Sequence, residues 1–123
     1  VIGAYASNAN GPTSGQVSVY GLVSGSWVQL GTDIDGAFAG DRFGVSVDMN
    51  ALGDRIVVGA DLNDVVRYNS GQVKIYEYSS GAWRKIGNDI SGESNDDYFG
   101  YALAMNDLGD RIVVGAYFDD GNG

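Results

Sequence analysis

The sequence predicts an all-β fold made of small antiparallel sheets that repeat along the chain, and three observations support this. Residues 1–56 align with residues 57–112 without a gap, and 25 of the 56 positions are identical. Large apolar residues alternate with small or polar ones, which is the period of a half-buried strand. Gly is frequent (20 of 123 residues) and Pro occurs once. A period of 56 indicates a repeat architecture, in which each unit buries its apolar faces against its neighbours.

The first complete unit opens with a predicted β-hairpin over residues 43–60. Every second residue of 43–49 is large and apolar, so this segment is predicted to be a strand. Residues 50–54 contain Gly before a charged pair and predict the hairpin loop. Residues 55–60 predict the second strand, in which Gly59 would let a neighbouring sheet approach closely.

The rest of the unit predicts two more strands after a variable loop. Residues 61–70 are polar and differ most between copies, so they are predicted to form a loop. Residues 71–76 alternate again and predict the third strand, and Ser80-Gly81 predicts the turn into a fourth strand over 83–90. Residues 91–97 connect to the next unit. The first copy holds the same elements 56 residues earlier.

Four short strands per unit and no helical pattern indicate β-propeller blades, with a linear β-solenoid as the alternative. We expect residues 1–42 to form an incomplete blade of three strands and residues 43–98 to form a full blade. Residues 99–123 would supply the first two strands of the next blade. Because the chain opens in the middle of the pattern at Val1, we expect it to be a window on a longer array.

The recurring motifs resemble the FG-GAP repeat, the blade of integrin alpha-chain propellers. The residues that carry the resemblance are Phe43-Gly44, Phe99-Gly100, Gly3-Ala4, Gly59-Ala60, Gly115-Ala116, and the strands that begin Gly15-Gln16-Val17 and Gly71-Gln72-Val73. Residues 27–34 and 83–90, each starting with Trp, resemble a subgroup found in long tandem arrays. The resemblance implies an extracellular or cell-surface protein.

Composition excludes several kinds of chemistry. The chain has no Cys and no His, so it has no disulfides, thiolate nucleophiles, imidazole bases or usual zinc ligands. Its formal charge of −9 disfavours nucleic acid as a partner. No apolar run approaches the roughly 18 residues needed to cross a bilayer, so no membrane insertion is expected. No catalytic residues are predicted, and the protein is not expected to be an enzyme.

The resemblance implies calcium as a possible cofactor. Integrin-type blades often carry a calcium loop of the form Asp-x-Asn/Asp-x-Asp-Gly-x-x-Asp in the first hairpin. Residues 48–54 and 104–110 occupy that place, but Leu52 and Leu108 stand in the middle and Ala104 replaces Asp48. Calcium takes six to eight oxygen ligands, and these hairpins cannot offer them. No confident metal site is predicted.

The remaining weak metal candidates are Asp119, Asp120 and Asn122, which lie in the variable loop of the third copy. Asp, Asn and Gly in such a run suit either a turn or a calcium loop made of oxygen ligands. Two further groups of carboxylates follow the fourth strands, namely Asp33, Asp35 and Asp41 in one copy and Asp89, Glu93, Asp96 and Asp97 in the other. We interpret them as solvated turn residues, with cation binding as the alternative.

Two other residue types recur at fixed places. Trp27 and Trp83 are predicted to pack between adjacent blades, with stacking on sugar rings as the alternative. Arg55 and Arg111 are predicted to bridge to a neighbouring strand and not to clamp a substrate.

The sequence therefore favours a non-enzymatic extracellular scaffold or adhesion module that works through its variable loops. The alternative is a glycan- or protein-binding propeller attached to a secreted hydrolase. The expected partners are neighbouring blades of the same chain or other copies of it, and an extracellular protein or glycan.

Overall fold

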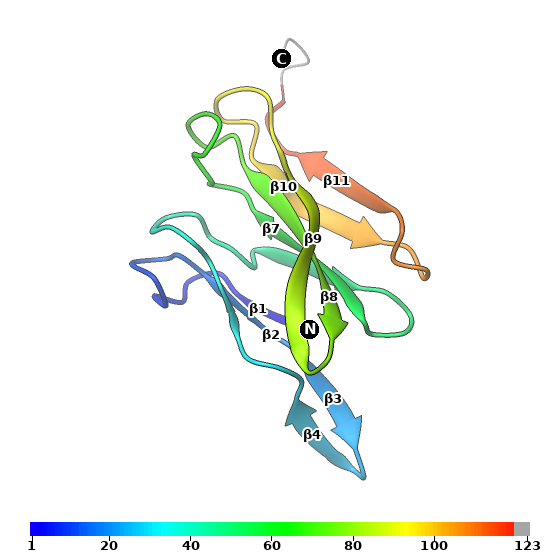
Figure 1. The fold of residues 1–123 in the computed structure, drawn as a ribbon. Helices are drawn as coiled ribbons and strands as arrows, with labels where there is room; N and C mark the ends of the chain where they lie inside the picture. Colours follow the sequence, from blue (N-terminus) through cyan, green and yellow to red (C-terminus); the bar gives the residue numbers. More distant parts are fainter. Residues whose placement is uncertain (120–123) are drawn as a thin grey trace.

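The structure is a computed structural model that describes residues 1–119. This range contains β-strands joined by turns and no helix, so none of its segments is a helix that could cross a membrane (Figure 1). The all-β prediction is confirmed. The strands are β1 Ile2–Ala4, β2 Gln16–Ser18, β3 Tyr20–Val23, β4 Ser26–Gln29, β5 Ile34–Asp35, β6 Ser46–Met49, β7 Arg55–Ala60, β8 Gln72–Ser79, β9 Ala82–Ser91, β10 Phe99–Met105 and β11 Ile112–Ala116.

The central sheet is an antiparallel meander of four strands in the order β6-β7-β8-β9. Its first hairpin pairs Met49 with Ile56, and its last pairs Ser79 with Ala82. A register shift between Val73 and Ile75 bends the outer pair of strands. This arrangement is the four-stranded blade that the repeat pattern predicts.

The N-terminal sheet holds the same elements without a first strand. Strands β1, β2 and β5 form one part, and the β3–β4 hairpin forms the other. Strand β2 leads into β3 through the single residue Val19, whose carbonyl accepts a hydrogen bond from the Leu30 amide at 2.8 Å. At the other end of the chain, β10 and β11 pair alone as a two-stranded sheet. The three units follow one another from the blue to the green to the orange strands in Figure 1.

The strand registers recur with the period of the sequence. Ala4 pairs with Gln16, and Ala60 pairs with Gln72. Met49 pairs with Ile56, and Met105 pairs with Ile112. Two residues that are 56 positions apart thus pair with residues that are themselves 56 positions apart. The sequence repeat is therefore also a structural unit.

The hydrophobic core lies between sheets and not within any one of them. Side chains from the N-terminal and central sheets meet in one cluster of buried residues: Val17, Val19, Phe43, Ile56, Val58 and Ala60. Alternate residues of β7 point the other way, where Val57 is fully buried beside the third sheet. Strand β7 is therefore buried on both faces, which explains its continuous apolar sequence.

The glycines of the two recurring dipeptides contact each other across the boundaries between sheets. A Cβ on Gly3 would overlap the carbonyl oxygen of Gly44, and a Cβ on Gly59 would overlap that of Gly100. The Gly of each Phe-Gly thus packs against the Gly of the Gly-Ala in the preceding unit. Gly115 has no such neighbour among the described residues, since a Cβ there would lie 3.6 Å from its nearest atom.

The predicted first strand begins later than expected. In the central sheet it starts at Ser46, because Gly44 has a φ of 89° and does not continue a strand. Gly100 has a φ of 93° inside β10, where a register shift occurs between Phe99 and Ala102. These left-handed glycines turn Phe43 and Phe99 away from regular alternation. Phe43 inserts into the core as a result.

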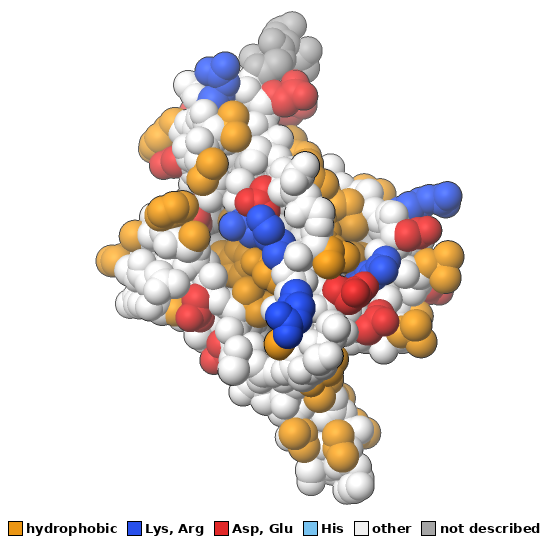
Figure 2. All heavy atoms as spheres, in the orientation of Figure 1, with side chains coloured by type: hydrophobic (Ala, Val, Ile, Leu, Met, Phe, Trp, Pro, Cys, Tyr) orange, Lys and Arg blue, Asp and Glu red, His pale blue; other side chains and the backbone are white. Residues whose placement is uncertain are grey.

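The two tryptophans have different surroundings although their sequence contexts match. Trp83 lies against the N-terminal sheet, and its Nε1–H donates to the Leu30 carbonyl at 2.8 Å. Trp27 is 71% exposed and lines an apolar cavity of about 450 Å³ with Val1, Ile2 and Tyr20. Figure 2 shows hydrophobic side chains over the protruding β3–β4 hairpin at the bottom. The expected packing between blades holds for Trp83, and Trp27 differs because no sheet of the described chain precedes its own.

Candidate functional site

In the β6–β7 and β10–β11 hairpins, the side chain of an asparagine closes the loop through hydrogen bonds. The Asn50 side chain accepts hydrogen bonds from the amides of Asp54 and Arg55, and its Nδ2 donates to Asp54 Oδ1 at 2.7 Å. Asn106 makes the same three bonds in the next unit. In each hairpin the asparagine NH2 group therefore donates to the aspartate carboxylate that a bound calcium ion would need as a ligand.

Asp48, the first acid of the hairpin, is engaged in the same way. One of its oxygens accepts from the Met49 amide, and the other accepts from the Met105 amide of the next sheet at 2.8 Å. Leu52 fills the middle of the loop and is exposed. The hairpin residues therefore do not fit calcium, and within residues 1–119 no group of three or more acidic, His or Cys side chains could hold a metal ion.

We expect EDTA to change the melting temperature by less than about 2 °C, because the hairpins are closed by amide hydrogen bonds that need no ion. A thermal melt followed by circular dichroism, with and without 5 mM EDTA, measures this. Adding excess calcium to the same sample is the control. A loss of many degrees in EDTA that calcium restores would mean that a metal supports the fold.

Loops and connectors alternate along one end of the molecule. Connector 36–42 lies beside loop 5–14, with which it shares backbone bonds such as Arg42 amide to Thr13 carbonyl at 3.0 Å. Connector 92–98 lies beside loop 61–70 through the equivalent bond from Tyr98 to Asn69, at 3.1 Å. This row of segments, which we call the loop end, is where the side chains differ most between units.

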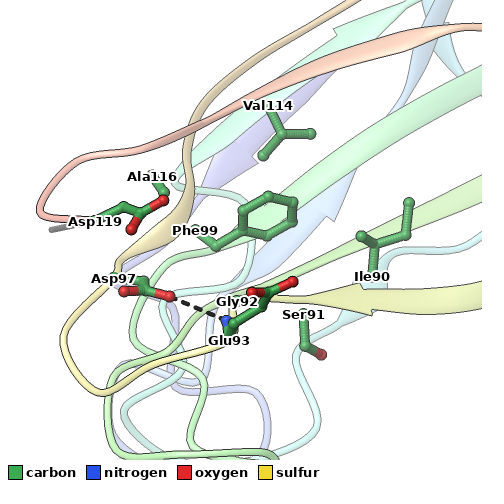
Figure 3. A pocket seen from close by; sticks show the side chains of 9 residues that line it. All are labelled: Ile90, Ser91, Gly92, Glu93, Asp97, Phe99, Val114, Ala116 and Asp119. Atoms are coloured by element: carbon green, nitrogen blue, oxygen red, sulfur yellow. Dashed lines mark hydrogen bonds between the residues drawn. The ribbon is translucent and has the colours of Figure 1, made fainter. Parts of the chain in front are cut away.

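The weak metal candidate Asp119 lies at the loop end. It lines a cavity of about 510 Å³ with the acidic residues Glu93 and Asp97 and the apolar residues Phe99 and Val114. Figure 3 shows Asp97, Asp119 and Ala116 at one side of this cavity, with Val114 and Ile90 toward the other. Asp97 Oδ2 accepts hydrogen bonds from the amides of Glu93 and Ser94. Asp120 and Asn122, the other two candidates, lie outside the described residues.

A buried polar set occupies the equivalent place one unit earlier. Asn63 Nδ2 donates to Asp41 Oδ2 at 2.8 Å, which joins loop 61–70 to connector 36–42. Beside it, the Arg42 guanidinium lies 3.4 Å from Asp61 Oδ2 and 5.0 Å above the Tyr5 ring. The set therefore holds two consecutive units together at the loop end.

Burial controls the ionisation of both carboxylates in this set. Asp41 is 6% exposed and Asp61 is 1% exposed. Burial raises the pKa of Asp41, although the hydrogen bond from Asn63 opposes the change. Burial also raises the pKa of Asp61, against the opposing charge of Arg42. One oxygen of Asp61 is buried without a hydrogen-bond partner among the described residues.

We expect Asp41→Asn to stabilise the fold at pH 7 by about 1 kcal/mol, since it removes a buried charge and keeps an acceptor for Asn63. A carboxyl whose pKa is raised on folding stabilises the native state fully below its unfolded pKa of 3.8, and this stabilisation is lost as the pH rises through the folded pKa. The gain from the substitution should therefore vanish below about pH 3.8. Urea unfolding at pH 3.5 and pH 7 measures it.

The control for that experiment is Asp35→Asn, which removes a negative charge at the exposed end of β5. It should leave the stability within about 0.5 kcal/mol. If Asp41→Asn destabilised the protein at pH 7, the charged form of Asp41 would be the favoured partner of Asn63.

Among the carboxylates that follow the fourth strands, Glu93 and Asp97 line one cavity, whereas Asp33 and Asp89 are engaged by side chains of their own units. Asp33 accepts hydrogen bonds from Ser18 and Gln29, and Asp89 lies between Lys74 and Lys85. The Lys74–Asp89 pair joins β8 to β9, and the Lys85–Asp89 pair lies within β9.

The structural role predicted for Arg55 is confirmed. Its Nε donates to Glu77 on the adjacent strand, and its Nη1 donates to the Gly109 carbonyl of the next sheet. Arg111, its equivalent, is exposed.

A comparison with known protein families identifies the repeat to which the recurring Phe-Gly and Gly-Ala dipeptides belong. Residues 91–123 match the family model described as the FG-GAP repeat. The chain contains an FG-GAP repeat. Residues 35–67 are its equivalent one period earlier. The two segments share the pairing of their first hairpin, and Gly44 and Gly100 make equivalent contacts with Gly3 and Gly59. No curated protein matches the chain.

The FG-GAP repeat and the four-stranded antiparallel sheet β6–β9 are compatible with a module built from β-propeller blades. In structural terms, the Phe-Gly of one unit and the Gly-Ala of the unit before it are the two halves of one contact.

The sequence did not indicate the buried polar set at the loop end. Asp41 and Asp61 look like ordinary turn residues, because their burial depends on two loops that lie next to each other only in the folded chain. One available signal was that Asp61 stands where the other copies have Tyr5 and Tyr117. A charged residue at an aromatic position suggests a partner, which here is Arg42.

Proposed function

We propose that this chain is a non-enzymatic scaffold or adhesion module of an extracellular or cell-surface protein, which contacts its partners through the loop end. The observation that carries the proposal is that the loops keep one backbone frame but change their side chains. In loop 5–14 the Ser7 amide donates to the Ala4 carbonyl, and the Gly15 amide donates to the Ser7 carbonyl, at 3.0 Å each.

Loop 61–70 repeats this frame with different contents. The Asn63 amide donates to the Ala60 carbonyl at 3.2 Å, and the Gly71 amide donates to the Asn63 carbonyl at 3.0 Å. Within the shared frame, residues 8–10 read Asn-Ala-Asn and residues 64–66 read Asp-Val-Val. A rigid frame with variable side chains is typical of a recognition surface.

The FG-GAP repeat supports the proposed location, because such repeats are typical of extracellular and surface proteins. The second candidate is a binding propeller attached to a secreted hydrolase. It is favoured by the exposed aromatic side chains of Phe38 and Tyr68 at the loop end, which could stack on sugar rings.

A loop exchange tests the proposal. In the variant, residues 64–69 are replaced by the sequence of residues 8–13, which the shared frame can accept and which leaves the buried residues Asp61 and Asn63 in place. Beads coated with each protein are tested for adhesion to surfaces of extracellular-matrix proteins and to a glycan array. We expect adhesion to the protein surfaces that the exchange abolishes while the circular dichroism spectrum is retained. Binding that survives the exchange, or binding to glycans alone, would reject the scaffold role in favour of another surface or of the second candidate.

A further inference from the structure

One apolar site occurs twice in the structure, once filled and once open. The open copy is a cavity of about 420 Å³ between the central and C-terminal sheets, and its apolar lining residues are Ile75, Ile86, Ile90, Met105 and Ile112. The equivalent residues one period earlier all belong to the core between the N-terminal and central sheets: Val19, Leu30, Ile34, Met49 and Ile56. Tyr76 and Trp83 of the central sheet pack against that core. The cavity is therefore the place that an equivalent tyrosine and tryptophan would fill.

The contacts of Trp83 show what the open site is shaped to hold. Its Nε1–H donates to the Leu30 carbonyl at 2.8 Å, and a Cβ on Gly31 would lie 3.0 Å from Trp83 Cδ1. The equivalents of Leu30 and Gly31 are Ile86 and Gly87, which line the open cavity. Gly87 has a φ of 71°, close to the 73° of Gly31. Apart from its chain neighbours, no described residue has an atom within 4 Å of a Cβ built on Gly87. The carbonyl and the glycine of an indole site are thus present without the indole.

The N-terminal sheet carries the matching side chains. Tyr20 and Trp27 are the equivalents of Tyr76 and Trp83, and they are 38% and 71% exposed. In Figure 1 the β3–β4 hairpin, which includes Trp27, protrudes at the bottom, and β11 lies near the top. Because the N-terminal and central sheets both separate Trp27 from the cavity, one copy of the chain cannot place its own Trp27 there. A second copy can.

Strand β11 also has a free edge. In the central sheet, the edge of β7 that faces away from β6 is covered by β8 through six residue pairs. Among the described strands, β11 pairs only with β10. An edge of unpaired backbone amides and carbonyls is a template for pairing with another chain.

The edge that fits β11 lies beneath β1. Strand β1 is held to β2 by only three residue pairs. Residues 1–5 and 113–117 are identical except at one position, where Ile2 corresponds to Val114. Strand β11 of one copy can therefore make with β2 of another the pairs that β1 makes in its own chain.

The glycines agree with such an exchange. Gly3 of β1 packs on Gly44, where an added Cβ would overlap the Gly44 carbonyl oxygen. Gly115 has the same place in β11, but its nearest neighbour to an added Cβ is 3.6 Å away. In the place of β1, Gly115 would pack on Gly44 of the second copy as Gly3 does.

We propose that a second copy of this chain completes the third unit by strand exchange. Strand β11 of one copy replaces β1 beside β2 of the other, and Trp27 of the second copy enters the open cavity, where its Nε1–H donates to the Ile86 carbonyl. The exchange buries Trp27, Tyr20 and the cavity lining, and this apolar burial drives it. Two different surfaces meet, so the copies join head to tail. This association goes beyond the proposed function and does not depend on it.

Sedimentation velocity and NMR test the proposal on the whole chain. We expect the sedimentation coefficient to rise as the concentration is raised from about 1 to 500 µM. In a mixture of isotope-labelled and unlabelled copies, filtered NOE spectra report only contacts between copies. They should show the Trp27 ring of one copy beside the methyl groups of Met105 and Ile112 of the other.

Variants with opposite expected effects locate the contact. Trp27→Ala and Gly115→Ala should each weaken association at least about tenfold, because they remove the indole and block the contact with Gly44. Gly3→Ala should strengthen association about tenfold, because it displaces β1 and leaves β2 open to β11 of the other copy. Val66→Asn, at an exposed position of loop 61–70, is the control and should have no effect.

Several outcomes would overturn the proposal. Sedimentation that does not depend on concentration would exclude association of the chain. Association that is equally strong in Trp27→Ala and Gly115→Ala would place the contact on another surface. Filtered NOEs between the Trp27 rings of two copies would show symmetric pairing of the N-terminal sheets. Weaker association of Gly3→Ala would mean that β1 stays in place and that no strand is exchanged.

Discussion

Gly59→Ala is expected to cost about 3 kcal/mol of unfolding free energy, or roughly 10 °C in melting temperature. The added methyl would overlap the carbonyl oxygen of Gly100 and the Ser46 hydroxyl. Neither neighbour can give way easily, because Gly100 belongs to β10 and Ser46 Oγ already donates to the Gly100 carbonyl at 2.6 Å. The central and C-terminal sheets would have to separate. Urea unfolding monitored by circular dichroism measures the loss.

Gly115→Ala is the matched control, because Gly115 has the same place in the third unit. Its added Cβ would lie 3.6 Å from the nearest atom, which is an ordinary contact. The variant should be unchanged or more stable by about 0.5 kcal/mol, since Ala reduces the freedom of the unfolded chain. Equal losses in the two variants would show that the glycine serves its own strand and not the contact between units.

Trp83→Ala is expected to cost about 3 kcal/mol. The substitution removes the indole that packs on the N-terminal sheet, the ring contact with Tyr78 at 5.1 Å, and the hydrogen bond to the Leu30 carbonyl. Gly31 gives the indole room, since a Cβ there would lie 3.0 Å from Trp83 Cδ1. Chemical denaturation of the variant measures the effect.

Trp27→Ala is the control at the equivalent position, and its cost should be below about 0.5 kcal/mol because the side chain is mostly exposed. Single-tryptophan variants add a second readout. The Nε1–H signal of Trp83 should exchange slowly with solvent, and that of Trp27 should exchange fast. Similar costs and similar exchange for the two would contradict the assignment of Trp83 to a contact between units.

The strands could be predicted because period-two alternation and turn glycines are local signals. The predicted hairpin loop at residues 50–54 and the second strand at 55–60 match β6–β7 closely. The late start of β6 could not be predicted, because Gly44 has a positive φ where it packs closely on Gln16, Val17 and Gly3 of the preceding unit, and this is a tertiary contact. The different surroundings of Trp27 and Trp83 are likewise set by which sheets flank them.

The candidate site was harder to predict than the fold. Variation between copies indicates the loop end, but no local pattern in the sequence shows that connector 36–42 lies between two loops. The burial of Asp41 and its bond to Asn63 arise from this tertiary arrangement. The departure of the hairpin from the calcium-loop motif could be predicted from the sequence, since Leu52 takes a ligand position. The structure adds that the Asn50 side chain closes the loop.

The most direct test of the repeat as a physical unit is to lengthen it. Inserting a second copy of residues 43–98 after residue 98 adds one sheet with both its contacts. Stacked units should raise the unfolding free energy by about 3 to 8 kcal/mol in a single transition, and the added tryptophan should show a slowly exchanging Nε1–H like that of Trp83. An unchanged free energy, or an added tryptophan as exposed as Trp27, would contradict the stacking of units through their Gly–Gly and Trp–carbonyl contacts.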